Sequence, residues 1–351
     1  MFKLFLYYIT ITACFLTGCN QYTMNEIQLI GSHNSYKLPI EEALWQHVYD
    51  IDSAQAMALQ YGHISMAEQL KLGLRSFEID VFYDPKGGHF SNPLGLEILK
   101  GKGIESEVFD QEKKLLEPGL KVMHIQDVDF RSHHVLFKEQ LEVMKTWSMN
   151  NVGHMPIIIL MNAKDQQVGQ LHPVLPFSTE ALASIDREIK EVFSPEQLIT
   201  PDLVRGDHIT LEEAVLTKGW PELDKVRNRF LFVLDESQEK TKRYLKAYPD
   251  LKDACLFVNL PEGNSEAAIM VINDPVRDFD KIKQLVKKGY IVRTRADADT
   301  REARINDYTR FEKAKASGAQ IISTDYYIKS ELFESSFVVS FEKNRYERLK
   351  K

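Results

Sequence analysis

Short runs of apolar residues recur along the chain from residue 26 onward, and eight of them have the length and composition of β-strands. Most of these runs are continuously apolar rather than alternating, which is typical of parallel strands that are buried on both faces. The eight predicted strands are 27–30, 76–82, 120–123, 157–161, 230–234, 254–258, 290–294 and 320–323.

Helical patterns lie between these runs. Residues 180–193 carry apolar side chains at helical spacing, and Thr210 with Glu213 forms a capping-box signature. Gly73, Gly289 and Gly318 each stand just before a predicted strand, where a helix commonly ends in a left-handed residue. Strand and helix alternating eight times without a domain boundary predict an α/β fold, a (β/α)8 TIM barrel with long loops after strands 2 and 4. A doubly wound open sheet is the alternative, although no GxGxxG motif follows the first strand.

The amino terminus has the features of a lipoprotein signal peptide. Lys3 precedes an apolar run over 4–16, which is shorter than the roughly 20 residues that a membrane-spanning helix needs. The sequence LTGC at 16–19 then resembles a bacterial lipobox, which predicts cleavage after residue 18 and lipidation of Cys19. Asn20 does not resemble the Asp signal for inner-membrane retention, so we expect a cell-envelope lipoprotein at an outer membrane or cell surface. A short uncleaved anchor is the alternative.

The rest of the chain divides into a tether (19–26), a catalytic barrel (27–327) and a charged C-terminal extension (328–351). With 44% hydrophobic residues the chain can bury a sizeable core, and its net charge of −7 makes nucleic acid an unlikely partner. After cleavage and lipidation, Cys255 would be the only unmodified cysteine, so no intramolecular disulfide is expected.

Polar side chains gather where the predicted strands end. Because the carboxyl ends of barrel strands share one mouth, these side chains should converge there. Glu78 and Asp80 stand at positions i and i+2 of one strand, so both carboxylates point to the same face. The other candidates are His33, Asn34, His124, Asn162, Lys164, Asp235, Asn259, Arg293, Arg295 and Asp325.

Two histidines, a carboxylate pair, amides and a cationic cluster at one rim suit phosphodiester cleavage. Oxygen ligands bind a hard cation, cationic side chains offset charge on the phosphoryl oxygens, and histidines transfer protons. Each residue also has a structural interpretation. His33 could be a hydrogen-bonded structural residue, and Glu78 with Asp80 could form salt bridges with Arg293 and Arg295.

Five segments together carry a family resemblance. They are GSHNSY (31–36), FEIDV (77–81), VMHIQD (122–127), RTRAD (293–297) and STDY (323–326). In this order they resemble the bacterial Ca²⁺-dependent phosphoinositide-specific phospholipases C, over about residues 27–327. The pattern is more distantly similar to the catalytic barrel of eukaryotic phospholipases C and to glycerophosphodiester phosphodiesterases.

The resemblance implies attack of the inositol 2-hydroxyl on phosphorus, which releases diacylglycerol and a cyclic inositol phosphate. It implies that His33 stabilises the phosphoryl charge and that His124 protonates the leaving oxygen. Asn34, Glu78 and Asp80, together with Asn162, would bind Ca²⁺. From the same segments we infer that Lys164, Arg293, Arg295 and Asp325 contact the substrate, a phosphoinositide lipid at a membrane surface.

One position departs from the pattern of related phosphodiesterases. They tend to have Glu-x-Lys where this chain has Asn162-Ala163-Lys164. An amide oxygen can bind calcium, but the change removes one negative charge and one candidate base, so weaker Ca²⁺ binding is expected. Two other functions stay open: a glycerophosphodiesterase, and a non-catalytic surface lipoprotein that binds inositol headgroups.

Overall fold

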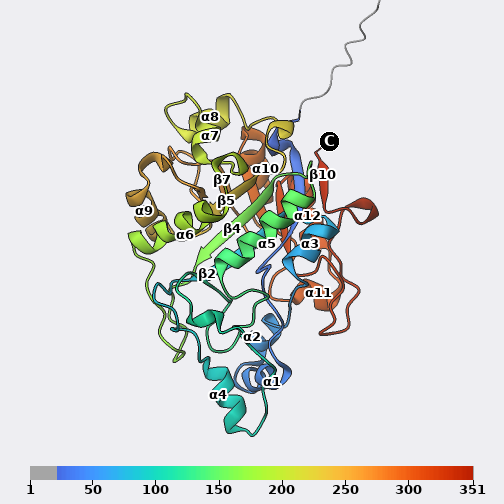
Figure 1. Cartoon of the computed structure of the whole chain (residues 1–351). Coiled ribbons are helices and arrows are strands. Elements are labelled where there is room, and N and C mark those ends of the chain that lie inside the picture. Colours follow the sequence, from blue (N-terminus) through green and yellow to red (C-terminus); the bar gives the residue numbers. More distant parts are fainter. Residues whose placement is uncertain (1–21, 351) are drawn as a thin grey trace, which may run out of the picture.

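The computed structural model describes residues 22–350, and its centre is a nearly closed barrel of eight parallel strands (Figure 1). Around the barrel the strands follow the order β6-β5-β4-β2-β1-β9-β8-β7, and a bridge between Asn259 and Ile269 joins the ends of this order. The predicted TIM barrel is therefore confirmed. The barrel strands are β1 (Ile27–Ser32), β2 (Ser76–Phe82), β4 (Ile157–Ala163), β5 (Phe230–Leu234), β6 (Leu256–Val258), β7 (Ile269–Val271), β8 (Ile291–Arg295) and β9 (Ile321–Thr324).

One of the eight strand predictions is wrong, and one barrel strand was not predicted. The run 120–123 does not form a barrel strand: β3 (Lys121–Val122) pairs antiparallel with the end of β2. The barrel strand that the sequence analysis missed is β7, which has only three residues and follows β6 after a loop containing Gly263. So short a strand gives almost no periodic signal, whereas 120–123 is just as apolar as a true barrel strand.

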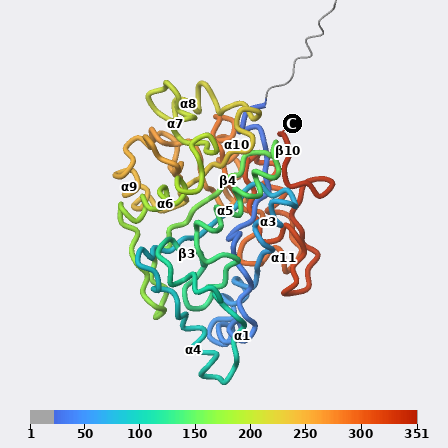
Figure 2. Tube along the Cα trace, in the orientation of Figure 1, coloured from blue at the N-terminus to red at the C-terminus, as the bar shows by residue number. Residues whose placement is uncertain are grey.

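Helices cover the outside of the barrel and also form an insertion beyond its mouth (Figures 1 and 2). The predicted helix at 180–193 is α6, and its N-cap Ser178 accepts a hydrogen bond from the backbone of Ala181. Thr210 caps α8 in the same way, although Glu213 accepts the backbone N–H of Ile209 rather than that of Thr210. The helices are α1 (Glu42–Ile51), α2 (Ser53–Ala58), α3 (Met66–Leu72), α4 (Leu94–Gly101), α5 (Phe137–Asn150), α6 (Thr179–Val192), α7 (Pro201–Arg205), α8 (Leu211–Thr217), α9 (Gln238–Ala247), α10 (Phe279–Lys288), α11 (Arg301–Ile305) and α12 (Thr309–Ser317).

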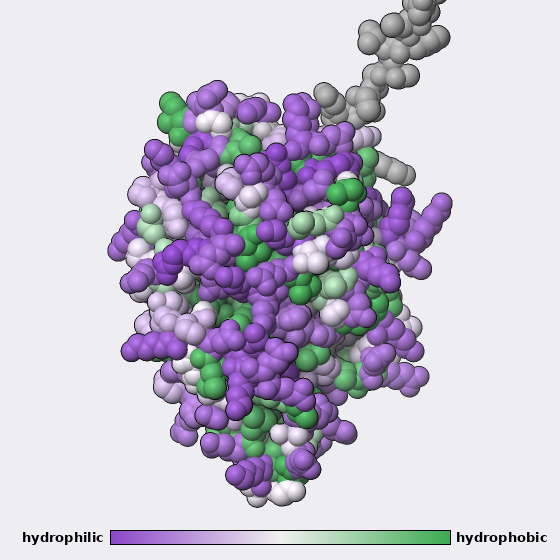
Figure 3. All heavy atoms as spheres, viewed as in Figure 1, coloured by the Kyte–Doolittle hydropathy of each residue, from purple (hydrophilic) through white to green (hydrophobic). Residues whose placement is uncertain are grey.

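The core has two parts. A large apolar cluster fills the barrel walls and their contacts with the covering helices. A smaller one, which includes Leu44, Leu99 and Phe130, lies in the insertion formed by α1, α2, α4 and the segment around β3. The face shown in Figure 3 is predominantly hydrophilic. Across residues 22–350, no helix has the length and apolarity that a membrane crossing would require.

The last residues of the chain pack against the end of the barrel where the strands begin. Phe337, Val339 and Phe341 are buried, and β10 (Glu347–Leu349) pairs antiparallel with β1. The charged segment after residue 327 thus contributes both core side chains and a strand.

Candidate active site

The end of β1 places two of the candidate residues at the mouth. The backbone N–H of His33 donates to the carbonyl of Thr324 at the end of β9, at 3.1 Å. Asn34 follows with a left-handed backbone, φ 46°, a conformation that asparagine tolerates better than most residues. The chain therefore turns sharply at the mouth and presents both side chains there.

His33 is bound to a buried carboxylate. Its Nδ1 lies 2.9 Å from Oδ1 of Asp325, and the guanidinium of Arg295 lies 3.4 Å from both ring nitrogens. Burial and the nearby Arg295 hold the pKa of His33 well below its usual range. His33 is therefore neutral at neutral pH.

A second carboxyl group lies behind this pair. Asp297 accepts hydrogen bonds from the hydroxyl of Thr324 and from the backbone N–H of Asp325. Burial, and then the charge of Asp325, raise the pKa of Asp297 to about 7, and burial also raises the pKa of Asp325. Two carboxyl groups and Arg295 thus surround the inner side of His33.

His124 is held in the same way by a different carboxylate. Its Nδ1 lies 2.7 Å from Oδ2 of Asp129. The other oxygen of Asp129 lies 3.2 Å from Nζ of Lys37, and both of these side chains are fully buried. Lys37 also donates to the carbonyls of Leu59 (3.2 Å) and Tyr61 (2.6 Å). Although β3 is not a barrel strand, its pairing with the end of β2 still brings His124 to the mouth.

Tyr61 lies between the two histidines. Its ring centroid is 5.9 Å from that of His33 and 6.4 Å from that of His124, and its hydroxyl accepts a hydrogen bond of 2.7 Å from Nδ2 of Asn34. The two histidines therefore share one packed neighbour, and that neighbour also orients a candidate metal ligand.

The carboxylate pair lies inside the barrel, with a cation beside each carboxylate. Glu78 forms an ion pair with Arg293 from across the barrel and accepts a hydrogen bond of 3.1 Å from Nδ2 of Asn162. Oδ2 of Asp80 lies 3.0 Å from Nζ of Lys164, and the negative charge of Asp80 raises the pKa of Lys164. The structural interpretation of the pair as salt bridges is thus correct for Arg293, while Asp80 pairs with Lys164 rather than with Arg295.

Asp80 nevertheless has bonding capacity to spare. Both of its oxygens are buried without a hydrogen bond of good geometry. Within residues 22–350, no group of three or more His, Cys, Asp or Glu side chains is placed to hold a metal ion. A metal at this mouth would therefore rely on two carboxylates and the amide oxygens of Asn34 and Asn162. These donors are all oxygens and fit a hard cation such as Ca²⁺.

The structure brings the predicted residues together but gives some of them different surroundings from those expected. Lys164 has a side chain that is 36% exposed at the mouth, so it is open to a ligand. Arg293 and Asp325, which we expected to contact substrate, are almost completely buried and bind Glu78 and His33 instead. Asp235 and Asn259 bond to one another at 3.0 Å.

Four residues of the site escaped the sequence analysis: Asp129, Lys37, Tyr61 and His63. His63 donates from Nε2 to the carbonyl oxygen of His33 at 2.7 Å, and the same nitrogen lies 3.9 Å from Oδ1 of Asp325. Lys37 follows directly after the GSHNSY segment and Asp129 lies five residues after His124, so both were near a recognised motif. Nothing in the sequence around Tyr61 and His63 indicates their positions, because the loop between α2 and α3 carries them to the mouth.

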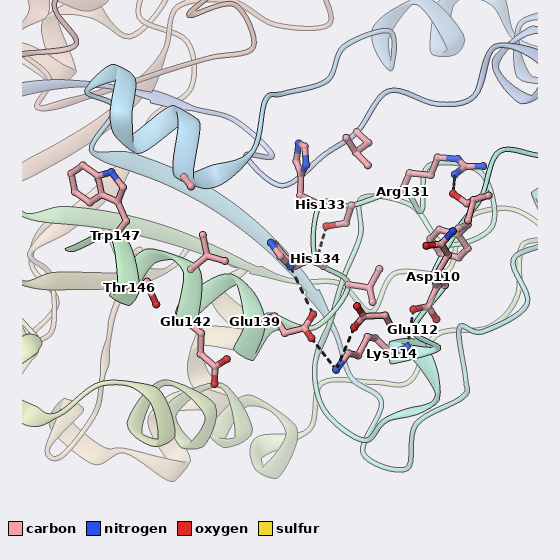
Figure 4. A pocket seen from close by; sticks show the side chains of 18 residues that line it. Asp110, Glu112, Lys114, Arg131, His133, His134, Glu139, Glu142, Thr146 and Trp147 are labelled. Carbon is pink, nitrogen blue, oxygen red and sulfur yellow. Dashed lines mark hydrogen bonds and ion pairs between the residues drawn. The ribbon is translucent and has the colours of Figure 1, made fainter. Parts of the chain in front are cut away.

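A hollow in the described surface lies apart from these residues. It has a volume of about 960 Å³ and lies between α5, the segment 108–114 and the segment 131–135 (Figure 4). Among its acidic residues, Glu139 lies 3.3 Å and Glu112 4.0 Å from Nζ of Lys114. Neither His33 nor His124 lines it, so the hollow is separate from the candidate active site.

Several solved structures with a similar fold are calcium-dependent phospholipases C. The chain is 15% identical to a calcium-dependent phosphoinositol-specific phospholipase C from a Gram-negative Pseudomonas species, described as a myoinositol complex; the TM-score is 0.56, over 94% of this chain and 96% of that one. The chain is also 15% identical to a Ca²⁺-dependent phosphatidylinositol-specific phospholipase C from Streptomyces antibioticus. The TM-score for this pair is 0.53, over 87% of this chain and 95% of that one. At such identities these likenesses establish the barrel class. No curated protein matches the chain.

The family follows from the sequence itself. The family model described as phosphoinositide phospholipase C, Ca²⁺-dependent, matches residues 22–350, which is almost the whole chain. The chain belongs to this family.

Proposed function

We propose that the chain is a Ca²⁺-dependent phosphodiesterase that cleaves phosphatidylinositol-type lipids to diacylglycerol and a cyclic or acyclic inositol phosphate. The observation that carries the proposal is the pair of histidines at one mouth, each held through Nδ1 by a buried carboxylate. Family membership and the myoinositol complex of the Pseudomonas relative support the headgroup.

His33 suits the role of general base. With Nδ1 directed at Asp325 and a pKa well below its usual range, the neutral ring can accept at Nε2 the proton of the attacking inositol hydroxyl. This revises the role implied by the family resemblance, in which His33 only stabilised phosphoryl charge. Arg295 lies beside the same ring, and in this proposal it offsets charge on the phosphoryl oxygens.

His124 suits the opposite role. Asp129 fixes its ring by Nδ1, which leaves Nε2 to donate a proton to the oxygen of the departing diacylglycerol. Lys37 in turn holds Asp129 and the loop that carries Tyr61, so the separation between the two histidines is fixed by buried contacts.

Asn34, Glu78, Asp80 and Asn162 would hold the Ca²⁺. When bound, the ion supplies positive charge beside the phosphoryl oxygens. Arg293 keeps Glu78 in place inside the barrel. Lys164 is the more exposed cation, and in this proposal it contacts a phosphate or an inositol hydroxyl.

The test is a product assay with phosphatidylinositol and with glycerophosphoinositol, each with and without Ca²⁺. We expect inositol phosphate from phosphatidylinositol only when Ca²⁺ is present. Turnover of the deacylated substrate alone would favour the glycerophosphodiesterase, and headgroup binding without turnover would favour the non-catalytic lipoprotein.

A further inference from the structure

The first described residues are fixed to the end of the barrel where the strands begin. The carbonyl of Tyr22 accepts a hydrogen bond of 2.7 Å from Leu223, and the N–H of Met24 donates to Pro221 at 2.9 Å. Asn25 donates from Nδ2 to the carbonyl of Gly289, which stands just before β8. These contacts leave the start of the folded chain no freedom to reach the mouth.

The candidate active site lies at the opposite end. His33 follows β1, whose six residues span about 20 Å. The insertion that carries α1, α2 and α4 extends beyond this mouth, at the opposite end of the molecule from the C-terminus and β10 (Figure 1). The site and the start of the folded chain are therefore separated by at least the length of the barrel strands.

The predicted lipidation site lies close to the fixed end. Cys19 is outside the described residues, but only three peptide steps separate it from Tyr22. Three residues span about 10 Å even when fully extended, which is about half the length of β1. A lipid on Cys19 would hold the barrel with its mouth directed away from the anchoring bilayer.

We propose that the protein acts in trans: it is anchored in one membrane through Cys19 and cleaves phosphoinositide headgroups in a second membrane that faces it. This inference rests on the proposed function and on lipidation of Cys19. Anchoring an enzyme beside its substrate normally raises the effective substrate concentration, but that gain vanishes when the linker cannot span the distance. The short tether therefore denies the enzyme the lipids of its own membrane.

The experiment measures how the rate depends on vesicle concentration. Lipidated full-length protein is inserted from outside into phosphatidylcholine vesicles that contain phosphatidylinositol, with Ca²⁺ present, and release of inositol phosphate per vesicle is followed on dilution. Because each cleavage needs a second vesicle, we expect the rate per vesicle to fall in proportion to vesicle concentration.

A variant with a longer tether provides the comparison. A Gly/Ser segment of about 40 residues inserted between Gln21 and Tyr22 reaches about 35 Å and should make the rate per vesicle independent of dilution. The same segment added after Lys351 is the matched control and should behave as the wild type. The proposal would be overturned if the rate per vesicle of the wild type did not change on dilution and equalled that of the long-tether variant.

The two underlying assumptions are tested separately. Cys19→Ser produced without residues 1–18, so that neither a lipid nor the apolar run 4–16 anchors it, should cleave phosphatidylinositol in any vesicle. If it does not, the proposed function fails and the trans proposal falls with it. Cys19→Ser should also lose the palmitate label that the wild type incorporates. A wild type without label would overturn the trans proposal while leaving the proposed function intact.

Discussion

The two histidine–carboxylate pairs at the mouth have the same local geometry but are built differently. His33 and Asp325 come from the ends of two neighbouring barrel strands, β1 and β9. His124 and Asp129 both belong to the inserted segment that begins at β3. The first pair has a second acid behind it, Asp297, whereas the second pair has a buried cation, Lys37.

This difference determines the charge balance of each pair. On the barrel side, burial raises the pKa values of both Asp297 and Asp325, and the charge of Asp325 raises that of Asp297 further. On the inserted side, Asp129 has a lysine of its own within 3.2 Å. The His33–Asp325 pair therefore has an additional acid beside it, whereas the carboxylate of the His124–Asp129 pair is neutralised by a lysine. The stability of the protein should respond differently when a charge is removed from one pair or from the other.

The largest effect should follow removal of a carboxylate charge. Asp129→Asn leaves Lys37 buried without its counter-ion and should lower the free energy of unfolding by about 3–5 kcal/mol. Asp325→Asn removes one of two neighbouring acids and should change it by less than about 1 kcal/mol. Urea unfolding measures both values. Lys37→Met combined with Asp129→Asn should recover much of the loss, and equal destabilisation by the two Asp→Asn variants would contradict the difference in charge balance.

Replacing the histidines should affect turnover equally on both sides. His33→Ala and His124→Ala should each lower turnover at least about 10²-fold, the usual scale for a positioned acid or base. The fold should survive, since each histidine side chain is 16% exposed at the mouth. Circular dichroism provides the folding control, and a variant with a near-wild-type rate would remove that histidine from the mechanism.

A change in the proposed metal site should spare both pairs. Asn162→Glu adds a negative charge beside Glu78 and should lower the half-saturating Ca²⁺ concentration about tenfold. Isothermal calorimetry with Ca²⁺ alone gives the affinity independently of activity. His124→Ala is the matched control and should leave the affinity unchanged. If Asn162→Glu does not alter Ca²⁺ binding, the role of Asn162 is limited to its hydrogen bond with Glu78.

The smallest effect concerns the support of the inserted segment. Glu188 accepts the backbone N–H of Leu120 just before β3, and burial raises its pKa to about 7. A carboxyl group whose pKa is raised in the folded state contributes stability at low pH that is lost as pH rises through about 7. Glu188→Gln keeps the hydrogen-bond acceptor but does not titrate. Between about pH 6 and pH 8 the wild type should therefore lose about 1 kcal/mol of stability that the variant keeps. Melting temperatures of the two proteins measure this difference. A pH-independent difference would show that Glu188 does not titrate in this range.

The sequence predicted the barrel-side pair more completely than the inserted one. Continuous apolar runs identified β1, β2 and β9, and parallel strands in a barrel necessarily bring their carboxyl ends together. His33, Glu78, Asp80 and Asp325 therefore converge as expected.

On the inserted side the sequence predicted His124 but not its partners. His124 was assigned to a barrel strand that does not exist, yet it reaches the mouth because β3 pairs with the end of β2. The partner of His124, Asp129, and the cation Lys37 depend on tertiary packing of loops, for which neither periodicity nor spacing provides a signal. The same limit applies to Tyr61, which the loop after α2 places between the histidines.

The most direct test of the proposed function is phosphorus NMR of the products formed from phosphatidylinositol. With Ca²⁺ present, we expect loss of the phosphodiester lipid signal and the appearance of an inositol phosphate, with no change in chelator. His33→Ala and His124→Ala should both leave the lipid signal intact. Full activity in chelator would contradict the calcium mechanism and would leave Glu78 and Asp80 as ion-pair partners of Arg293 and Lys164, while an unchanged lipid signal under all conditions would contradict phospholipase activity.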